Sequence, residues 1–584
     1  MNRHTNVAAA DFPSGKTFRQ ASGLLPFLAL TIPLLLLGFG FTQTLSAQAG
    51  PAGGTDPATE TAPVPELRLP DLDTEVRGVA PKELEAPQPS FDPLPAPVTE
   101  PPLPPGKELT LPESAYLTEA TLDTVARDGK GDTFTEASAG TGLWDAVSAS
   151  LSIYRPGSDP SFSMTFTHDA LDGFAYHEAG DGFSRRITTL SGRVRGALGD
   201  GSVWRFAAGF RDEANGLQGQ SQDFYGVSQR YLDLGGSYRK PFGKLFGGEL
   251  GLLSELALGS ASRALELSAS DPAGITGVDE LILVPRIATE LRFEKVSLEL
   301  VSFYEFRGLL GLDSEDNPKD RYSHRGGADL KADFELSSSL SLAADLGFAS
   351  SVAFPALVPF SLSAEAGLGG FASLSLSGGL RSDLNTFSSA WQNNPYLDIG
   401  ELPPDDARWF SDGKLDLFLA PGLSARLGGT WAMSLDGAGR ITPVAPTLVT
   451  RGLYTYLVEP YDSLASTLSL RWVAGAASAG LSWIADWMDA PLLGERQQFK
   501  AEMEYRERAE SFGGAVSASV GFGADGFDVP VVDAGGFVSL TPELRFIAEF
   551  RDVVLAFRGM EGRIRWDPFY AEGFQASVRI QISL

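Results

Sequence analysis

Hydrophobic residues alternate with polar or small residues over most of the chain beyond residue 113. Between Leu281 and Phe306, two such runs are separated only by Glu294 and Lys295. A period of two places the apolar side chains on one face of a β-strand, and a two-residue gap has the length of a hairpin turn. The pattern therefore predicts antiparallel strands joined by hairpins.

The length of these runs distinguishes two kinds of β protein. A soluble sandwich also alternates, but its strands are much shorter, whereas a strand that crosses a bilayer needs about 9–11 residues with one apolar face. Within hydrocarbon every backbone group must be paired, so such a sheet has to close on itself. We therefore expect an all-β fold with a large closed antiparallel transmembrane β-barrel over residues 114–584.

The spacing of turns predicts the number of strands. Ten short links alternate with ten long ones, which gives 21 strands from near Trp144, and a preceding strand over 133–140 makes about 22. Counts of 20 or 24 stay open. The predicted short links are 155–160, 199–201, 241–246, 294–295, 337–339, 369–370, 421–422, 475–478, 509–512 and 541–543.

Two segments precede the predicted barrel. Residues 24–41 form an uncharged apolar run that follows Lys16 and Arg19 and precedes the small-x-small sequence 47–49, which is the pattern of a secretory signal peptide over residues 1–49. A retained membrane anchor is the alternative. Residues 50–113 are rich in Pro and in acidic residues, which predicts a disordered or extended periplasmic linker. Its role is either that of a spacer or that of a docking arm for a periplasmic partner.

Composition excludes several functional classes. The chain has 584 residues, 46 Lys or Arg and 74 Asp or Glu, so its net charge of −28 argues against binding to nucleic acid. It contains no Cys, which excludes disulfides, thiolate metal sites and a lipid anchor on Cys. We predict no enzyme activity and no catalytic, cofactor or metal site. His168 beside Asp169 is the one pair weighed for catalysis, and we interpret it as part of a polar hairpin loop.

Charged residues on the second face of the strands are expected to line the lumen. Seven of the ten candidates are acidic and three are basic, so we expect a conducting barrel to prefer cations. The ten candidate lumen charges are Arg286, Glu290, Arg292, Glu299, Glu305, Asp329, Lys331, Asp333, Glu335 and Asp345.

The longest predicted external loop covers residues 382–412. Its aromatic residues Trp391, Tyr396 and Trp409 are candidate external-loop contacts, because exposed loop aromatics often form binding surfaces. The same residues could instead fold inward and constrict the lumen. The sequence does not separate these alternatives.

The chain resembles the barrel of TonB-dependent receptors. Residues 143–173 (LWDAVSASLSIYRPGSDPSFSMTFTHDALDG) resemble the opening strands of such barrels, and FRDVVLAF and GFQASVRIQISL resemble the closing ones. The alternation up to the final Leu584 also resembles the terminal strand of bacterial outer-membrane barrels. The resemblance implies a barrel in the outer membrane of a bacterium with two membranes. The receptors also carry a folded plug domain before the barrel, and the Pro-rich segment has no recognisable counterpart of it.

We therefore expect a protein that passes or takes up a solute across the outer membrane. Its expected partners are outer-membrane lipid, the outer-membrane assembly machinery and a periplasmic partner of the Pro-rich segment. One alternative function is that of a structural or interaction barrel tethered by its Pro-rich arm. A secreted, soluble β-rich protein is the third hypothesis.

Overall fold

The protein was analysed as a computed structural model. It describes residues 133–267, 275–276, 279–310, 322–351, 354, 356–399, 402–444, 452–488, 495–523, 526–558 and 562–584. The predicted signal peptide and Pro-rich linker lie outside the described residues.

The described residues form one sheet of 24 strands, and two of these, β8 (Ile275–Thr276) and β23 (Gly526–Phe527), have only two residues each. The 22 that remain are the long strands of a barrel. The first eleven are β1 (Phe134–Gly142), β2 (Val147–Arg155), β3 (Ser161–Asp172), β4 (Ser184–Ala197), β5 (Val203–Gly216), β6 (Gly226–Leu245), β7 (Gly248–Glu266), β9 (Asp279–Arg292), β10 (Val296–Leu310), β11 (Tyr322–Ser337) and β12 (Leu340–Ser351). The other eleven are β13 (Phe360–Gly367), β14 (Ala372–Asp383), β15 (Asp406–Ala420), β16 (Leu423–Ser434), β19 (Asp462–Ala474), β20 (Ala477–Met488), β21 (Glu495–Arg506), β22 (Phe512–Gly523), β24 (Val531–Ser539), β25 (Leu544–Arg551) and β28 (Gln575–Ser583).

Short elements lie in the links between these strands. They are the hairpins β17 (Arg440–Pro443) with β18 (Tyr456–Glu459) and β26 (Ile564–Trp566) with β27 (Phe569–Tyr570), the 3-10 helix η4 (Gly369–Phe371), and the helices α3 (Phe387–Asn393) and α4 (Val553–Arg558). None of the helices in the described part of the chain is long and apolar enough to cross a membrane.

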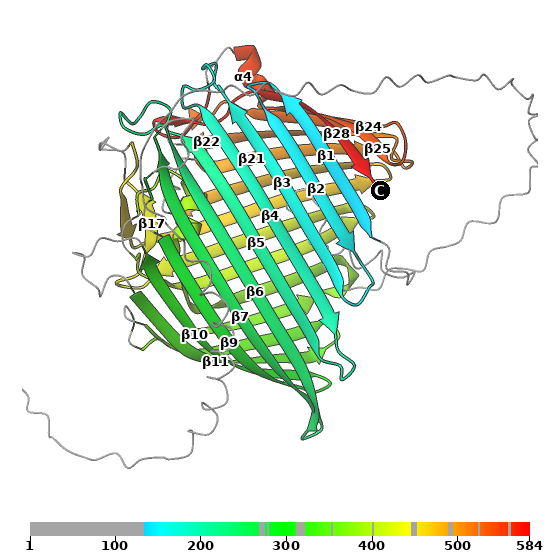
Figure 1. The fold of residues 1–584 in the computed structure, drawn as a ribbon. Helices are drawn as coiled ribbons and strands as arrows, with labels where there is room; N and C mark the ends of the chain where they lie inside the picture. Colours follow the sequence, from blue (N-terminus) through cyan, green and yellow to red (C-terminus); the bar gives the residue numbers. More distant parts are fainter. Residues whose placement is uncertain are drawn as a thin grey trace, which may run out of the picture. The chain divides into compact units, whose positions relative to one another are not determined.

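The sheet closes through its first and last strands. Every long strand pairs antiparallel with the next long strand along the chain, and β1 pairs with β28 in a register that sets Ala139 opposite Ile580. Figure 1 shows β1 in cyan beside β28 in red. Closure leaves no free sheet edge along this seam. The predicted all-β fold and its closed antiparallel barrel of 22 strands are confirmed.

The two faces of the wall differ as the alternation predicts. Leu300, Leu330 and Leu346 lie directly opposite one another on three neighbouring strands, and their side chains are 52%, 47% and 57% exposed. The residues that precede or follow them in the sequence are Glu299, Lys331 and Asp345, on the other face. Large apolar side chains exposed on one face of a closed sheet match the lipid-facing surface of a transmembrane barrel.

Consecutive links leave opposite ends of the barrel. The end with the tight turns, such as Glu294–Lys295 between β9 and β10, is called the short-turn end, and the other is called the long-loop end. One predicted turn, 241–246, is present but shorter than predicted, because β7 begins at Gly248 and β6 continues to Leu245 despite Pro241 and Gly243. A register shift between these two residues accommodates them, and β6 beyond residue 239 pairs with β7 alone. Pro is tolerated on such an edge segment because the donor that it lacks is not needed there.

A second local difference concerns the segment FRDVVLAF near the end of the chain. Its first residues end β25, but Val553–Arg558 form the short helix α4 instead of continuing the strand. The last strand, β28, has the predicted alternation, with Val578, Ile580 and Ile582 exposed on the outer face.

Candidate functional site

Most buried hydrophobic side chains of the described residues gather at the long-loop end. They belong to the parts of β6, β7 and β10 nearest the long-loop end and to four long loops, 217–225, 384–405, 435–461 and 552–574. We call the described parts of these four loops the loop cap. The buried members are Leu217, Val227, Tyr231, Ala261, Leu265, Leu309, Phe387, Ala390, Trp391, Tyr396, Leu397, Ile399, Leu453, Tyr454 and Phe569. A packed cluster thus joins the described parts of the loops to the inner wall of the barrel at this end.

Loop 384–405 crosses the mouth of the barrel. It leaves from β14 and returns to β15, but Gln229 Nε2 on β6 donates a hydrogen bond to Pro395 O at 2.7 Å, and Arg263 Nη1 on β7 donates one to Leu397 O at 2.7 Å. Strands β7 and β9 to β13 separate β6 from β14 around the wall. A loop that starts at β14 reaches β6 only by spanning the opening.

Two buried arginines hold this loop against the wall. The Arg307 guanidinium, 3% exposed, forms an ion pair with Glu280, 1% exposed, and donates a hydrogen bond to Pro403 O at 3.1 Å. The second carboxylate oxygen of Glu280 accepts the Phe387 backbone N–H at 2.8 Å. Arg263, 4% exposed, is paired with Asp398. Because the Arg307–Glu280 pair lies away from water, removing one partner leaves a buried charge without compensation.

The same arginines face aromatic rings of helix α3. The Arg307 guanidinium lies 5.8 Å from the centre of the Phe387 ring, and that of Arg263 lies 5.6 Å from the Trp391 ring. A cation over an aromatic face gains energy from the ring quadrupole, more so where water is excluded. The ion pairs and the cation–ring contacts of these two arginines therefore both stabilise the docked position of loop 384–405.

The sequence of α3 explains why a helix forms in this loop. Thr386 caps the helix, since its side chain accepts the Ser389 N–H at 3.0 Å while the Ser389 hydroxyl accepts the Thr386 N–H at 3.2 Å. Phe387, Ala390 and Trp391 follow at the spacing of one helix face and are buried. The helix thus presents a single apolar face to the wall.

The other loops support loop 384–405 from the opposite side. The Phe569 ring stacks on the Tyr396 ring with centroids 3.7 Å apart, and Gln218 forms two hydrogen bonds with the backbone of Tyr570. Tyr454 forms an isolated parallel bridge with Leu397. Burial raises the pKa of the Tyr396 phenol, so this group stays neutral and donates its hydrogen bond to Gly216 O at 3.3 Å.

A cavity of about 190 Å³ lies within the loop cap. Its charged lining consists of Arg185, Arg211, Arg565, Glu213 and Glu572. Arg185 is paired with Glu572, and Arg211 Nη2 lies 2.5 Å from Glu213 Oε2. The Arg565 guanidinium stacks 4.3 Å from the Trp566 ring centre. The lining is therefore polar and aromatic, with one more positive than negative side chain.

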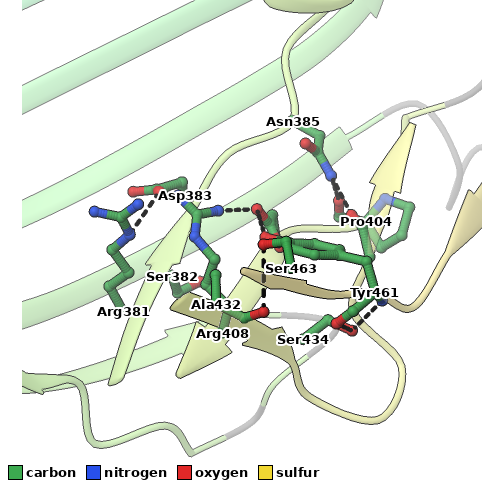
Figure 2. Close-up of polar contacts among 12 residues, drawn as sticks. Arg381, Ser382, Asp383, Asn385, Pro404, Arg408, Ala432, Ser434, Tyr461 and Ser463 are labelled. Atoms are coloured by element: carbon green, nitrogen blue, oxygen red, sulfur yellow. Dashed lines mark hydrogen bonds and ion pairs between the residues drawn. The ribbon is translucent and has the colours of Figure 1, made fainter. Parts of the chain in front are cut away.

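Polar contacts anchor the bases of two cap loops, as Figure 2 shows. Arg408 Nη2 donates to Asp383 Oδ2 at 2.7 Å across β14 and β15, and the Tyr461 hydroxyl donates to Asp406 at 3.0 Å. Asn385 Nδ2 donates to the carbonyls of Pro404 and Gly439 at 2.8 and 2.9 Å. Loop 384–405 is thus tied to loop 435–461 near its base as well as at its tip.

The three aromatic candidates of the predicted external loop have different environments. Trp391 and Tyr396 lie in the buried cluster of the loop cap, 1% and 4% exposed. Trp409 does not lie in the loop, because β15 begins at Asp406, and its ring packs edge-on against Phe360 with centroids 5.7 Å apart. The folded state offers none of the three as a freely exposed loop aromatic.

The ten candidate lumen charges occur on four consecutive strands, β9 to β12. The structure brings some of them together. Arg292 lies 3.3 Å from Glu290, and Glu305 lies 3.8 Å from Arg286 and 3.6 Å from Arg325. The other six, for which the described residues show no ion pair, are Glu299, Asp329, Lys331, Asp333, Glu335 and Asp345.

Sequence reasoning missed the residues that hold the loop cap. Arg263, Glu280 and Arg307 lie near strand ends, where the alternation gives no indication that they contact a distant loop. A signal was present for α3, because Thr386 and Ser389 have the spacing of a capping pair before an apolar i, i+3, i+4 face.

The structure does not assemble a catalytic pair at His168. Its Nδ1 lies 2.9 Å from Thr188 Oγ1, and Asp169 points to the other face of the strand. The described part of the chain contains no group of three His, Cys, Asp or Glu residues that could hold a metal ion.

Comparisons with known proteins identify the fold. No family model matches the chain, and no curated protein matches its sequence. Among solved structures, the copper transporter OprC is similar with a TM-score of 0.58 and 13% identity over 78% of this chain and 81% of that one. The ferric enterobactin receptor PfeA of Pseudomonas aeruginosa and the iron transporter FrpB of Neisseria meningitidis each have a TM-score of 0.55 and 12% identity over the same shares. The chain thus has the barrel fold of TonB-dependent outer-membrane receptors, as the sequence resemblance implied.

Proposed function

We propose that this protein is an outer-membrane barrel through which a solute passes, and that loop 384–405 is the gate of the passage. The observation that carries the proposal is the contact of this loop with the far wall through Arg263, Arg307 and Trp391. A loop that spans the mouth and docks on the far wall has the arrangement of a lid, and lids open without unfolding the scaffold beneath them.

The surface of the barrel supports an outer-membrane location. Its outer face exposes large apolar side chains on strand after strand, and the described part of the wall is closed, which satisfies backbone groups within lipid. The similar solved structures are transporters and receptors, which supports a role in uptake. Their names refer to copper, ferric enterobactin and iron, and the proposal for this chain names a passage without a metal cargo.

A structural barrel tethered by its Pro-rich arm is the second candidate. The loop cap agrees with it as well, because a barrel that never opens would show the same packed loops. The two candidates differ in whether release of the cap creates a passage.

Liposome swelling tests the proposal. In Trp391→Ala the loop loses its largest buried side chain, a change that costs about 3–5 kcal/mol in a core and so favours the open state by roughly 100-fold or more. Asn393→Ala, on an exposed position of the same helix, is the matched control. We expect rapid entry of a neutral pentose with Trp391→Ala and slow entry with wild type and Asn393→Ala.

The assay requires that all three proteins are folded, which heat-modifiable migration on electrophoresis verifies. If a folded Trp391→Ala barrel admits no pentose, the passage is refuted and the structural role is favoured.

A further inference from the structure

Two groups of charges on the inner wall, both toward the short-turn end, have opposite sign. The arginine sector consists of Arg193, Arg195 and Arg205 on β4 and β5. The acidic sector lies on β10 to β13 and includes one lysine. Its members are Glu299, Asp329, Lys331, Asp333, Glu335, Asp345 and Glu365.

Alternation places the arginine sector on the inner face. Arg205 shares its face of β5 with Arg211, which lines the cavity beneath the loop cap, whereas Phe206 on the other face is exposed with the outer apolar residues. Arg195 lies directly opposite Arg205 in the register, near the turn that joins β4 to β5. No described residue forms an ion pair with Arg195 or Arg205. Like charges directly opposite destabilise a sheet, so the pair has a cost in stability.

The acidic sector, like Arg195 and Arg205, has no ion pair with the described residues. Asp333 and Glu335 are near the end of β11, and Glu365 is near the end of β13, all close to short turns. The seven members of this sector are six acidic side chains and one lysine, and the described residues form no ion pair within 4.0 Å with any of them. Its charge is therefore strongly negative.

The wall between the two sectors is electrically mixed. Glu290 is paired with Arg239 and Arg292, and the register sets Glu249 opposite Arg292 and Glu255 opposite Arg286. Opposite charges at this spacing largely cancel each other for a solute in the lumen. The arginine and acidic sectors therefore stand out as one positive and one negative side of the passage.

We propose that the passage selects zwitterionic solutes of the amino-acid class, and this inference rests on the proposed function. A field that runs across the lumen orients a solute that carries both charges, so that each end faces the sector of opposite sign. A simple ion is attracted by one sector and repelled by the other. The cation preference was expected from ten charges that all lie on β9 to β12. The arginines of β4 and β5 were not among them.

Liposome swelling with two solutes of nearly equal size tests the inference in the Trp391→Ala background. Glutamine is the zwitterion and arabinose is the neutral control. We expect glutamine to enter several-fold faster than arabinose at low salt. The advantage should shrink as ionic strength rises to about 0.15 M, where the screening length falls to about 8 Å.

Neutralising two charges of either sector should reduce the advantage. Arg195→Gln with Arg205→Gln, and separately Asp333→Asn with Glu335→Gln, should bring the two entry rates closer together while arabinose entry stays unchanged. Lys500→Gln with Glu502→Gln removes an ion pair of 3.3 Å from β21 and is the matched control, which should keep the advantage.

The outcomes separate the two proposals. Entry of arabinose without any preference for glutamine, or a preference of unchanged size in both double variants, overturns the zwitterion inference and leaves the passage intact. Failure of both solutes to enter contradicts the passage itself, and the zwitterion inference with it.

Discussion

Single buried side chains determine how firmly the loop cap is held. Arg263 and Arg307 connect loop 384–405 to the wall, but Arg263 Nε, Arg307 Nη2, Gln229 Oε1 and Asn394 Nδ2 have no hydrogen-bond partner within the described part of the structure. A buried polar atom without a partner costs about 1–3 kcal/mol. The contact therefore combines strong ion pairs with unsatisfied groups, which suits a loop that must both dock and leave.

The Arg307→Ala variant tests this account of the contact. The change strands the Glu280 carboxylate in the buried cluster, at a cost of about 3–5 kcal/mol. The chain has no Cys, so a single Ala390→Cys reports on the opening, because Ala390 is buried beneath the docked helix. We expect a water-soluble maleimide to label Ala390→Cys roughly 100-fold faster when Arg307→Ala is also present, since about 1.4 kcal/mol corresponds to a factor of ten.

Arg506→Ala provides the control for this experiment. Arg506 forms an ion pair with Glu504 in which both side chains are half exposed, and such pairs contribute about 0–1 kcal/mol. Labelling should then change little. Equal labelling rates for Arg307→Ala and Arg506→Ala would show that the buried pair does not hold the loop.

At the scale of elements, the sequence predicts the strands far better than the loops. The β9–β10 hairpin follows from a strict period of two and a two-residue gap, and both are local signals. The loop cap depends on contacts such as that between Gln229 and Pro395, which lie far apart in the chain. No local pattern encodes such a contact, so the sequence left the choice between binding surface and constriction open for Trp391 and Tyr396.

The alternation pattern also assigns the two charged sectors to a strand face with unequal success. The acidic residues of β11 alternate with large apolar residues, so their face could be assigned from the pattern. Arg193 and Arg195 alternate instead with Gly and Val at the end of β4, and Arg205 follows Trp204, which weakens the contrast between the faces. The register with neighbouring strands resolves what alternation alone does not.

At the scale of the whole molecule, the described strands close the barrel among themselves. Each long strand has two paired neighbours, and β1 and β28 close the ring by themselves. The Pro-rich linker, residues 50–113, lies outside the described residues, and we predict that it is not an integral part of the barrel. Its Pro and acidic content gives it little apolar surface with which to offset the entropy of ordering.

Deletion of residues 55–110 tests that prediction. We expect normal assembly in the membrane and a midpoint of heat-modifiable migration within a few degrees of the full chain, because a change of 1 kcal/mol shifts the midpoint of a large domain by only about 2–4 °C. A large fall in the midpoint, or strong hydrogen-exchange protection over this segment in the full chain, would show that the segment is an integrated domain.

The central claim is that loop 384–405 closes a passage, and a recording from one barrel before and after chemical trapping tests it most directly. A bulky maleimide attached to Ala390→Cys cannot be accommodated in the docked position, because that side chain is buried, so it should hold the loop open. In a planar bilayer we predict low conductance at first and a lasting step increase on addition of the reagent, whereas Asn393→Cys, exposed on the same helix, should be labelled without any step. Complete labelling of Ala390→Cys with unchanged conductance would contradict the account.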